Sequence, residues 1–230
     1  MANELTAARG VPWFRETEVF TSGAEGYHTF RIPALAVAPD GTILAFCEGR
    51  RHGGDDYFAN YLVLKRSTDN GVTWGDLQLL VGDPDRTMNN PTVVVDRDTD
   101  TVWLAFCRHA YEVFVMKSND SGASWSEPKN ITNEAKLPGW TKYDLGTGHG
   151  IQLSSGRLVI PGSHKEGTRT DWVYSHSHVI YSDDHGEHWK VGGSIGKGTN
   201  ESQLVETRAD ELYFNVRTAE RTVFSRVAAW

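Results

Sequence analysis

Cysteine is scarce in this chain, and the long apolar runs of membrane proteins are missing. The two cysteines, Cys47 and Cys107, both stand inside short apolar stretches, where a free thiol behaves as a small buried hydrophobe, so we expect no disulfide. No segment approaches the ~20 apolar residues that span a bilayer, and the N-terminus lacks the apolar stretch of a signal peptide. We therefore expect no membrane association and a cytoplasmic location for the chain as given, with export of a longer parent left open.

An excess of positive charge is also missing. The sequence has 30 acidic residues against 23 lysines and arginines, which gives a formal net charge of -7. A nucleic-acid-binding protein needs a basic face to displace counterions from phosphates, so nucleic acid is not an expected partner. An anionic ligand would need a local basic pocket instead, and nothing in the sequence indicates an oligomeric state.

What the sequence does contain is aromatic residues and glycine. Phe, Trp and Tyr make up 11% of the chain, which also has 23 glycines. This composition suits many short strands joined by tight turns better than a helical bundle. The fold class predicted is therefore all-β.

A repeated motif organises the chain. Three segments, 65–74, 116–125 and 180–189, share the pattern Ser-x-Asp-x-Gly-x-(Thr/Ser/His)-Trp. In such a turn the Asp accepts backbone hydrogen bonds, the Gly adopts a conformation closed to other residues, and the Trp anchors the hairpin in the core. Structural roles are thus predicted for Asp69, Asp120 and Asp184. A calcium loop is the alternative, but it needs more alternating oxygen ligands and a closing Glu, so we expect no metal.

The strands expected around these turns recur in units of about 50 residues, the length of one propeller blade. They are 31–37, 42–47, 60–67, 92–95, 101–107, 112–118, 151–153, 158–160 and 177–182, with a fourth unit at 202–206, 212–216 and 222–225. At Ser225 and Arg226, where a fourth turn should begin, the pattern fails. Because a propeller must close to protect its edges, we expect a lead-in at 1–12 and, over 13–230, a propeller truncated in its fourth repeat.

Two further motifs give the chain a family resemblance. Phe30-Arg31-Ile32-Pro33 precedes the repeated turns, and Asn200-Glu201-Ser202-Gln203 is followed by Arg217. The repeated turns are Asp boxes, the turn motif of some β-propellers. Together with the two further motifs they resemble the exo-sialidase (neuraminidase) family of six-bladed Asp-box propellers, over nearly the whole chain. The resemblance implies that the chain covers the first three to four blades. It also implies release of terminal sialic acid from glycoproteins, glycolipids or oligosaccharides with net retention and without a cofactor.

The substrate explains the residues that the resemblance implies. Sialic acid carries a carboxylate on its anomeric carbon, which would repel a carboxylate nucleophile, and the family uses a tyrosine instead. A neighbouring Glu activates that phenol, and guanidinium groups match the substrate carboxylate bidentately. By resemblance, Arg31 and Arg217 are the first two members of the arginine triad, and Glu201 is the base. An Arg between Phe and Ile-Pro is an odd place for a merely solvated charge.

The acid/base carboxylate should come from a glycine-containing loop that follows Glu48, because such a group must be open to the substrate. In the family that the chain resembles, this Asp is followed by a strand that ends in the Arg-Ser of the first Asp box, so counting back from Arg66 and Ser67 implies Asp56, with Asp55 as the second choice. Arg50 resembles the family's additional active-site arginine.

Two other segments have both a functional and a structural interpretation. Met88 and Asn89 resemble the loop that lines the family's N-acetyl pocket, where a thioether packs well against a methyl group; the alternative is a simple loop filler. The histidine-rich segment 171–178 could suggest a metal site with His176 and His178 on one strand face. Without a third ligand nearby, histidines of a rim strand are favoured.

Two parts of the family's site match nothing in this chain. Neither Tyr181 nor Tyr213 stands in the position of the nucleophilic tyrosine, and no residue after Arg217 supplies the third arginine. The 230-residue chain is therefore expected to be inactive or nearly so. A non-catalytic Asp-box propeller that binds glycan or protein is the alternative, and a trans-sialidase would share the same site.

Overall fold

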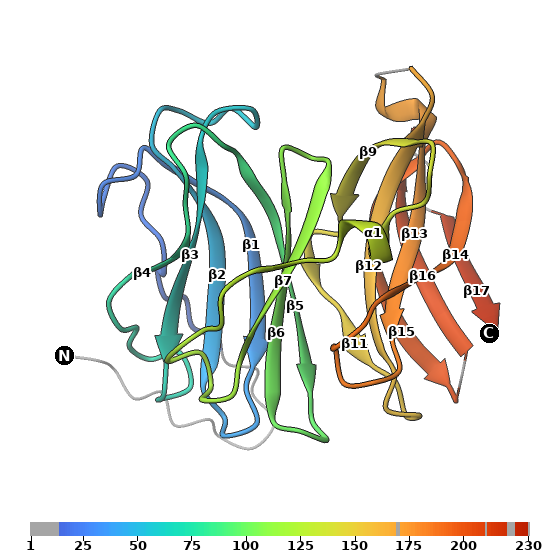
Figure 1. Ribbon diagram of the computed structural model, residues 1–230. Helices are drawn as coiled ribbons and strands as arrows, with labels where there is room; N and C mark the ends of the chain where they lie inside the picture. The colour runs from blue at the N-terminus through green and yellow to red at the C-terminus, as the bar shows by residue number, and fades with distance from the viewer. Residues whose placement is uncertain (1–13, 169–170, 210, 220–223, 230) are drawn as a thin grey trace.

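The computed structural model describes residues 14–168, 171–209, 211–219 and 224–229. Within these residues the chain forms four β-sheets that follow one another in chain order and stand side by side (Figure 1). The all-β prediction is confirmed. The lead-in expected at 1–12 lies outside the described residues, as do the first two residues of the strand expected at 222–225.

The first two sheets are meanders whose strands match the predicted order. The first contains β1 (Thr29–Val37), β2 (Ile43–Arg50), β3 (Asn60–Ser67) and β4 (Gln78–Val81). The second contains β5 (Met88–Asp96), β6 (Thr101–Arg108), β7 (Glu112–Ser118) and β8 (Lys129–Asn130), with β10 (Gly148–His149) added in parallel beside β5. The inner strands β2, β3 and β6 are buried along nearly their whole length, on both faces of their sheets.

The third sheet departs from this plan at its first strand. Its members are β11 (Ile151–Gln152), β12 (Leu158–Glu166), β13 (Ser175–Ser182) and β14 (Lys190–Lys197), with β9 (Trp140–Leu145) also paired to β12. β11 pairs with the beginning of β12 and β9 with its end, so two short segments share one edge. β9 and the helix α1 (Thr132–Ala135) were not predicted, and they lie in the longer spacing between the second and third Asp boxes. A 3-10 turn, η1 (Trp172–Tyr174), precedes β13.

The fourth sheet consists of β15 (Thr199–Arg208), β16 (Glu211–Thr218) and β17 (Phe224–Ala229). β17 pairs antiparallel with β16 and takes the place that the third strand holds in the other sheets. The failed Asp-box pattern therefore falls inside a strand.

Each Asp-box turn is closed by hydrogen bonds among its own residues. In the second box, Asp120 accepts bonds from the Ser124 amide at 2.8 Å and hydroxyl at 2.6 Å, and the Ser118 hydroxyl accepts the amide of Gly122 at 2.8 Å. Bonds from the side chain and amide of Ser124 hold the pKa of Asp120 at about 2. The turns at Asp69 and Asp184 repeat this pattern.

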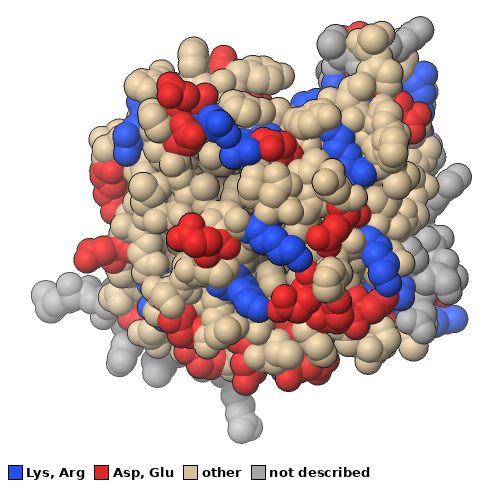
Figure 2. Space-filling view, viewed as in Figure 1, with Lys and Arg blue, Asp and Glu red and all other residues tan. Residues whose placement is uncertain are grey.

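The core lies between neighbouring sheets rather than at one centre. Phe46 of the first sheet and Phe106 of the second belong to one buried cluster, and Trp189, 2% exposed, belongs to the cluster between the second and third sheets. Cys47 and Cys107 are free and buried, and burial raises the pKa of Cys47 to about 12. Among the described residues no helix is long and apolar enough to cross a membrane. On the face in Figure 2, acidic and basic side chains are interspersed.

Candidate active site

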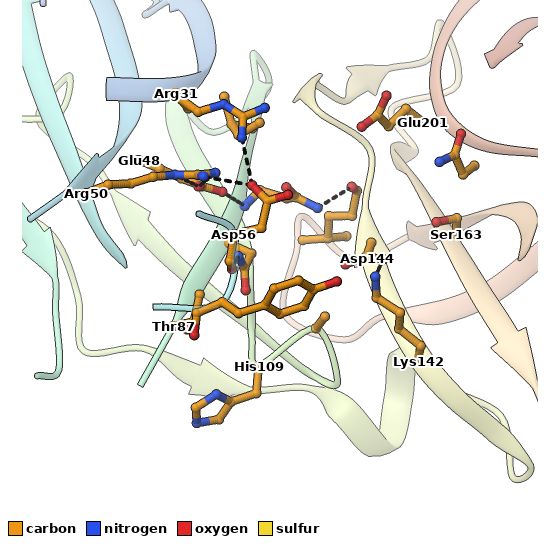
Figure 3. A pocket seen from close by; sticks show the side chains of 17 residues that line it. Arg31, Glu48, Arg50, Asp56, Thr87, His109, Lys142, Asp144, Ser163 and Glu201 are labelled. Carbon is orange, nitrogen blue, oxygen red and sulfur yellow. Dashed lines mark hydrogen bonds and ion pairs between the residues drawn. The ribbon is translucent and has the colours of Figure 1, made fainter. Parts of the chain in front are cut away.

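A cavity of about 240 Å³ opens where residues of all four sheets meet (Figure 3). This volume is just below the ~300–1,000 Å³ of typical small-molecule sites. The lining comprises Arg31, Ile32, Glu48, Arg50, Asp56, Tyr57, Thr87, Asn89, Asn90, His109, Ala110, Lys142, Asp144, Leu145, Ser163, Asn200 and Glu201. Four of the predicted site residues, Arg31, Arg50, Asp56 and Glu201, thus share one hollow, together with Asn89.

Arg31 enters the cavity from a distorted part of β1. Ile32 has a φ of 56°, and the register of β1 against β2 shifts between Arg31 and Ala34. Such a bulge re-aims a side chain and is common beside functional sites. The Arg31 Nη1 donates to Asp56 Oδ1 at 2.9 Å and to the carbonyl of Gly54 at 3.2 Å, and the Arg31 side chain stays 45% exposed.

Behind Arg31 lies a buried pair, Arg50 and Glu48, whose side chains are 2% and 1% exposed. Arg50 donates from Nε and Nη2 to Glu48 Oε2 at 3.0 and 2.5 Å, and from Nη1 to Asp56 Oδ1 at 2.7 Å. The other Glu48 oxygen accepts the Asn90 amide at 2.8 Å. Burial raises the pKa of Glu48, while the Asn90 amide and Arg50 favour its ionised form. Glu48 therefore fixes Arg50, which in turn fixes Asp56.

Asp56 and Asp55, the two choices left open by the sequence, point to different places. Asp56 lines the cavity and receives both Arg31 and Arg50. Asp55 accepts the amide of Tyr57 at 2.8 Å and is not among the lining residues. The geometry thus favours Asp56 as the carboxylate that can meet a ligand.

Glu201 and Arg217 reach the site from the fourth sheet. Glu201, on β15, lines the cavity, and Arg217, on β16, donates from Nη1 to Glu201 Oε2 at 2.9 Å. Their side chains are 46% and 56% exposed. Arg217 is not itself a lining residue, so it adjoins the hollow beside Glu201. Arg31 and Arg217 therefore do not lie on opposite outer surfaces.

Met88 and Asn89 begin the strand β5 and do not form the predicted loop, because Met88 is already paired with Arg108. Met88 is 4% exposed and packs in the cluster between the first two sheets, away from the cavity lining. Asn89 does line the cavity, and its Nδ2 donates to the carbonyl of Asp56 at 3.4 Å. Asn89 can therefore contact a ligand in the cavity, and Met88 cannot.

The wall opposite Asp56 comes from β9 and β12 and was missed in the sequence. It presents Lys142, Asp144 and Ser163 to the cavity (Figure 3). The Lys142 ammonium lies 3.0 Å from Asp144 Oδ2. Burial raises the pKa of Asp144, an effect that Lys142 opposes. The spacing of Lys142 and Asp144 on one strand face was the available signal, but β9 itself was not predicted.

The histidine-rich segment is part of the interior, and the expectation of a rim strand is wrong for His178. β13 lies between β12 and β14, and His178 is 0% exposed. Its Nδ1 is 3.1 Å from the Nδ1 of His164, whose ring stacks on Trp140 with centroids 3.5 Å apart. Burial lowers the pKa of His164 to about 4 and that of His178 well below its usual value. Both rings are thus neutral core aromatics.

A metal site would require clustered ligands, and one such cluster occurs among the described residues. Asp96, Asp98 and His185 have ligand atoms within 4.8 Å of one another. The Gln152 side-chain amide already donates to Asp96 at 2.7 Å and to Asp98 at 2.9 Å. His185 Nδ1 is 2.9 Å from the other oxygen of Asp96. None of the three lines the cavity. The cluster fastens the third Asp box to the end of β5.

Comparisons with known proteins point in one direction. A family model described as BNR repeat-like domain matches residues 76–229. The sialidase of Micromonospora viridifaciens is 31% identical over 95% of this chain and 37% of its own length, and sialidase-4 of Mus musculus is 35% identical over 89% and 48%. The solved structure "Hadza microbial sialidase Hz136" superposes with a TM-score of 0.82 at 26% identity, covering 89% of this chain and 46% of that one. The chain thus spans between about a third and a half of these relatives.

Proposed function

The chain belongs to the sialidase family of BNR-repeat propellers, and from that premise we propose that it carries part of an exo-α-sialidase active site. The reaction is release of terminal sialic acid from glycoproteins, glycolipids or oligosaccharides with retention. The observation that carries the proposal is that Arg31, Arg50, Asp56 and Glu201 line one cavity, with Arg217 bonded to Glu201.

Binding begins with an exchange of partners at the two outer arginines. Arg31 now holds Asp56, and Arg217 holds Glu201, each at 2.9 Å. A substrate carboxylate matches the planar guanidinium fork, so it replaces the protein carboxylates on both arginines. Asp56 keeps its bond to the buried Arg50, which holds it beside the leaving group.

The released carboxylates then do the proton chemistry. Once Arg31 has left it, Asp56 takes up a proton from solvent, gives that proton to the glycosidic oxygen as the bond to the leaving group breaks, and later accepts a proton from the attacking water. Glu201 takes the proton of the tyrosine nucleophile that the family uses in place of a carboxylate. Tyr57 lines the cavity, whereas Tyr181 and Tyr213 do not, and none of the three stands in the position that the family gives its nucleophile. We therefore expect the 230-residue chain to bind sialic acid without turning it over.

The first experiment tests binding and turnover separately on this chain. N-acetylneuraminic acid and its carboxamide, which lacks the negative charge, are titrated into the labelled chain and followed by NMR. The acid should bind and the carboxamide should not. Arg31→Lys should weaken binding of the acid by about tenfold or more, because the bidentate contact is lost. Arg157→Lys, whose partner Asp183 lies outside the cavity, is the control and should bind normally.

The same preparation is offered a fluorogenic sialoside. No release is expected, and release at ordinary enzymatic rates would contradict the inactivity of the chain. In a longer parent that turns over sialosides, Asp56→Asn and Glu201→Gln should each abolish turnover while substrate still binds. Unchanged turnover in either variant removes that residue from the mechanism.

A further inference from the structure

A bulge interrupts β5 where Asn89 and Asn90 line the cavity. The register of β5 against β6 shifts between Asn89 and Thr92, so Asn90 and Pro91 are left out of the pairing with β6. Asn90 has a φ of 55°, in the left-handed region that asparagine tolerates better than most residues. Proline has no N–H. Of the two bulge residues, only Asn90 therefore has a backbone amide to donate.

The bulge directs both donor groups of Asn90 toward other sheets. Its amide donates to Glu48 Oε1 on β2 at 2.8 Å, and its side-chain Nδ2 donates to the Leu145 carbonyl on β9 at 3.2 Å. The Thr92 hydroxyl closes the bulge by donating to the Asn90 carbonyl at 3.2 Å. Glu48 and Leu145 both line the cavity. One residue of the second sheet thus joins the cavity-lining parts of the first and third sheets.

A residue with positive φ before a proline also occurs in β1, at Ile32 and Pro33, where the bulge turns Arg31 into the cavity. Backbone conformations of this kind persist at functional sites only where the surrounding structure holds them. In β1 the product of the bulge is the direction of a side chain. In β5 the product is the direction of an amide, the one that Asn90 donates to Glu48.

The bond from Asn90 to Glu48 bears on the reacting carboxylate. Glu48 is buried, which raises its pKa, and the Asn90 amide and Arg50 both oppose that rise. The other charged groups that face Glu48 are Asp56, which adds a like charge, and Arg31, its direct partner on β1. While Glu48 is ionised it holds Arg50, and Arg50 holds Asp56 at 2.7 Å (Figure 3). The amide of Asn90 therefore stands at the start of a chain of contacts that ends at Asp56.

We propose that Asn90, through the left-handed turn that directs its amide at Glu48, is a positioning residue for Asp56. The proposal rests on the function proposed above, which makes Asp56 the acid/base group. Asn90 acts through Glu48 and Arg50. General acid–base catalysis needs the carboxylate within hydrogen-bond reach of the leaving oxygen, and a displacement of about 1 Å can cost roughly 100-fold in rate. The turn at Asn90 thus contributes to the rate although it takes no part in the proton transfers.

The test on the 230-residue chain follows the side-chain carboxyl carbon of Glu48 by NMR as the pH is varied. Asn90→Val carries a β-branched side chain that disfavours positive φ, so the turn should open, the amide should withdraw, and Glu48 should titrate at a higher pH than in the wild type. Asn90→Gly adopts positive φ freely and should titrate close to the wild type, although it also lacks the side-chain bond to Leu145. In Asn90→Val the Arg50 Nε–H should exchange faster with solvent once its carboxylate partner is protonated.

Asn70→Val is the matched control, because Asn70 has a φ of 59° in the first Asp box and does not line the cavity. It should leave the titration of Glu48 as it is in the wild type. The inference is wrong, while the proposed function stands, if Asn90→Val titrates like the wild type or if Asn90→Gly or Asn70→Val shifts the titration as far as Asn90→Val does. Asn90→Ala, which lacks the β-branch, carries the test should Asn90→Val not fold.

In a longer parent that turns over sialosides, the same variants separate positioning from substrate binding. Asn90→Val should lower kcat by about tenfold or more and leave KM nearly unchanged, because Asp56 acts on the leaving group whereas the outer arginines bind the acid group. Asn90→Gly should restore kcat. An unchanged kcat in Asn90→Val would overturn the inference. If N-acetylneuraminic acid does not bind the wild-type chain, the proposed function fails, and Asp56 has no catalytic role for Asn90 to support.

Discussion

The Asp-box turns and the cavity are built from polar contacts of very different range. In each turn the hydrogen bonds of the Asp reach no farther than four residues, as from Asp69 to Thr73. In the cavity, Arg31 meets Asp56 across 25 residues, and Asn90 meets Leu145 across 55. The turns therefore form from local chemistry, whereas the cavity exists only once four sheets have packed. Mutations should separate the two regions in stability and in their response to pH.

The largest effect is expected from removing one partner of the buried pair. Glu48→Ala leaves the guanidinium of Arg50 inside the protein without its main counterion. Breaking a buried ion pair in this way costs about 3–5 kcal/mol of unfolding free energy. The matched control is Glu187→Ala, because the Glu187 side chain is 56% exposed in its pair with Lys117, and exposed pairs contribute about 1 kcal/mol or less. Urea unfolding that gives equal losses for the two variants would show that burial of Arg50 does not matter.

An intermediate effect should depend on which Asp box is changed. A Cβ at Gly186 would lie 2.3 Å from the ring of Trp103, whereas one at Gly71 meets nothing closer than 3.8 Å. Both glycines have positive φ, so either change to Ala costs about 1–2 kcal/mol in backbone strain. Gly186→Ala adds overpacking of about 1–3 kcal/mol. Thermal unfolding should therefore rank Gly186→Ala below Gly71→Ala, and identical midpoints would mean that the turns act independently of their neighbours.

The difference in range also explains what the sequence could reveal. The three turns, most strands of the first two sheets and the Phe30-Arg31-Ile32-Pro33 segment were visible because their patterns lie within a few consecutive residues. β9 was missed because its partner strand, β12, follows only after a crossing to the neighbouring sheet through β10.

The roles of individual side chains show the same limit. Glu48 and Arg50 alternate on one strand, but burial and the amide of Asn90, 42 residues away, decide what Glu48 does. Met88 was placed at a pocket because its motif is local, while the packing that buries it involves Leu44 and Phe106 of two different sheets. Asp144 became visible only with the register of β9 against β12.

The smallest effect is a pH dependence whose sign differs between the two regions. Hydrogen bonds from Ser124 lower the pKa of Asp120 from 3.8 to about 2. The unfolded chain then binds more protons in that range, so stability is fully present above pH ~4 and declines as pH falls toward 2. Burial raises the pKa of Asp144 above 3.8. The folded state then holds the extra proton, so this group lowers stability as pH rises from 3.8 through its raised pKa.

The two contributions can be separated by isosteric variants followed by urea unfolding between pH 2 and pH 7. Asp120→Asn should flatten the acid side of the stability profile, because its neutral amide has no carboxyl proton to gain. Asp144→Asn should flatten the opposite slope above pH 3.8 and leave the acid side as it is in the wild type. If both variants change the same side of the profile, the carboxylates of turn and cavity are not distinguished by burial. If the two variants flatten opposite sides of the profile, hydrogen bonding sets the pKa of Asp120 in the turn and desolvation sets the pKa of Asp144 in the cavity.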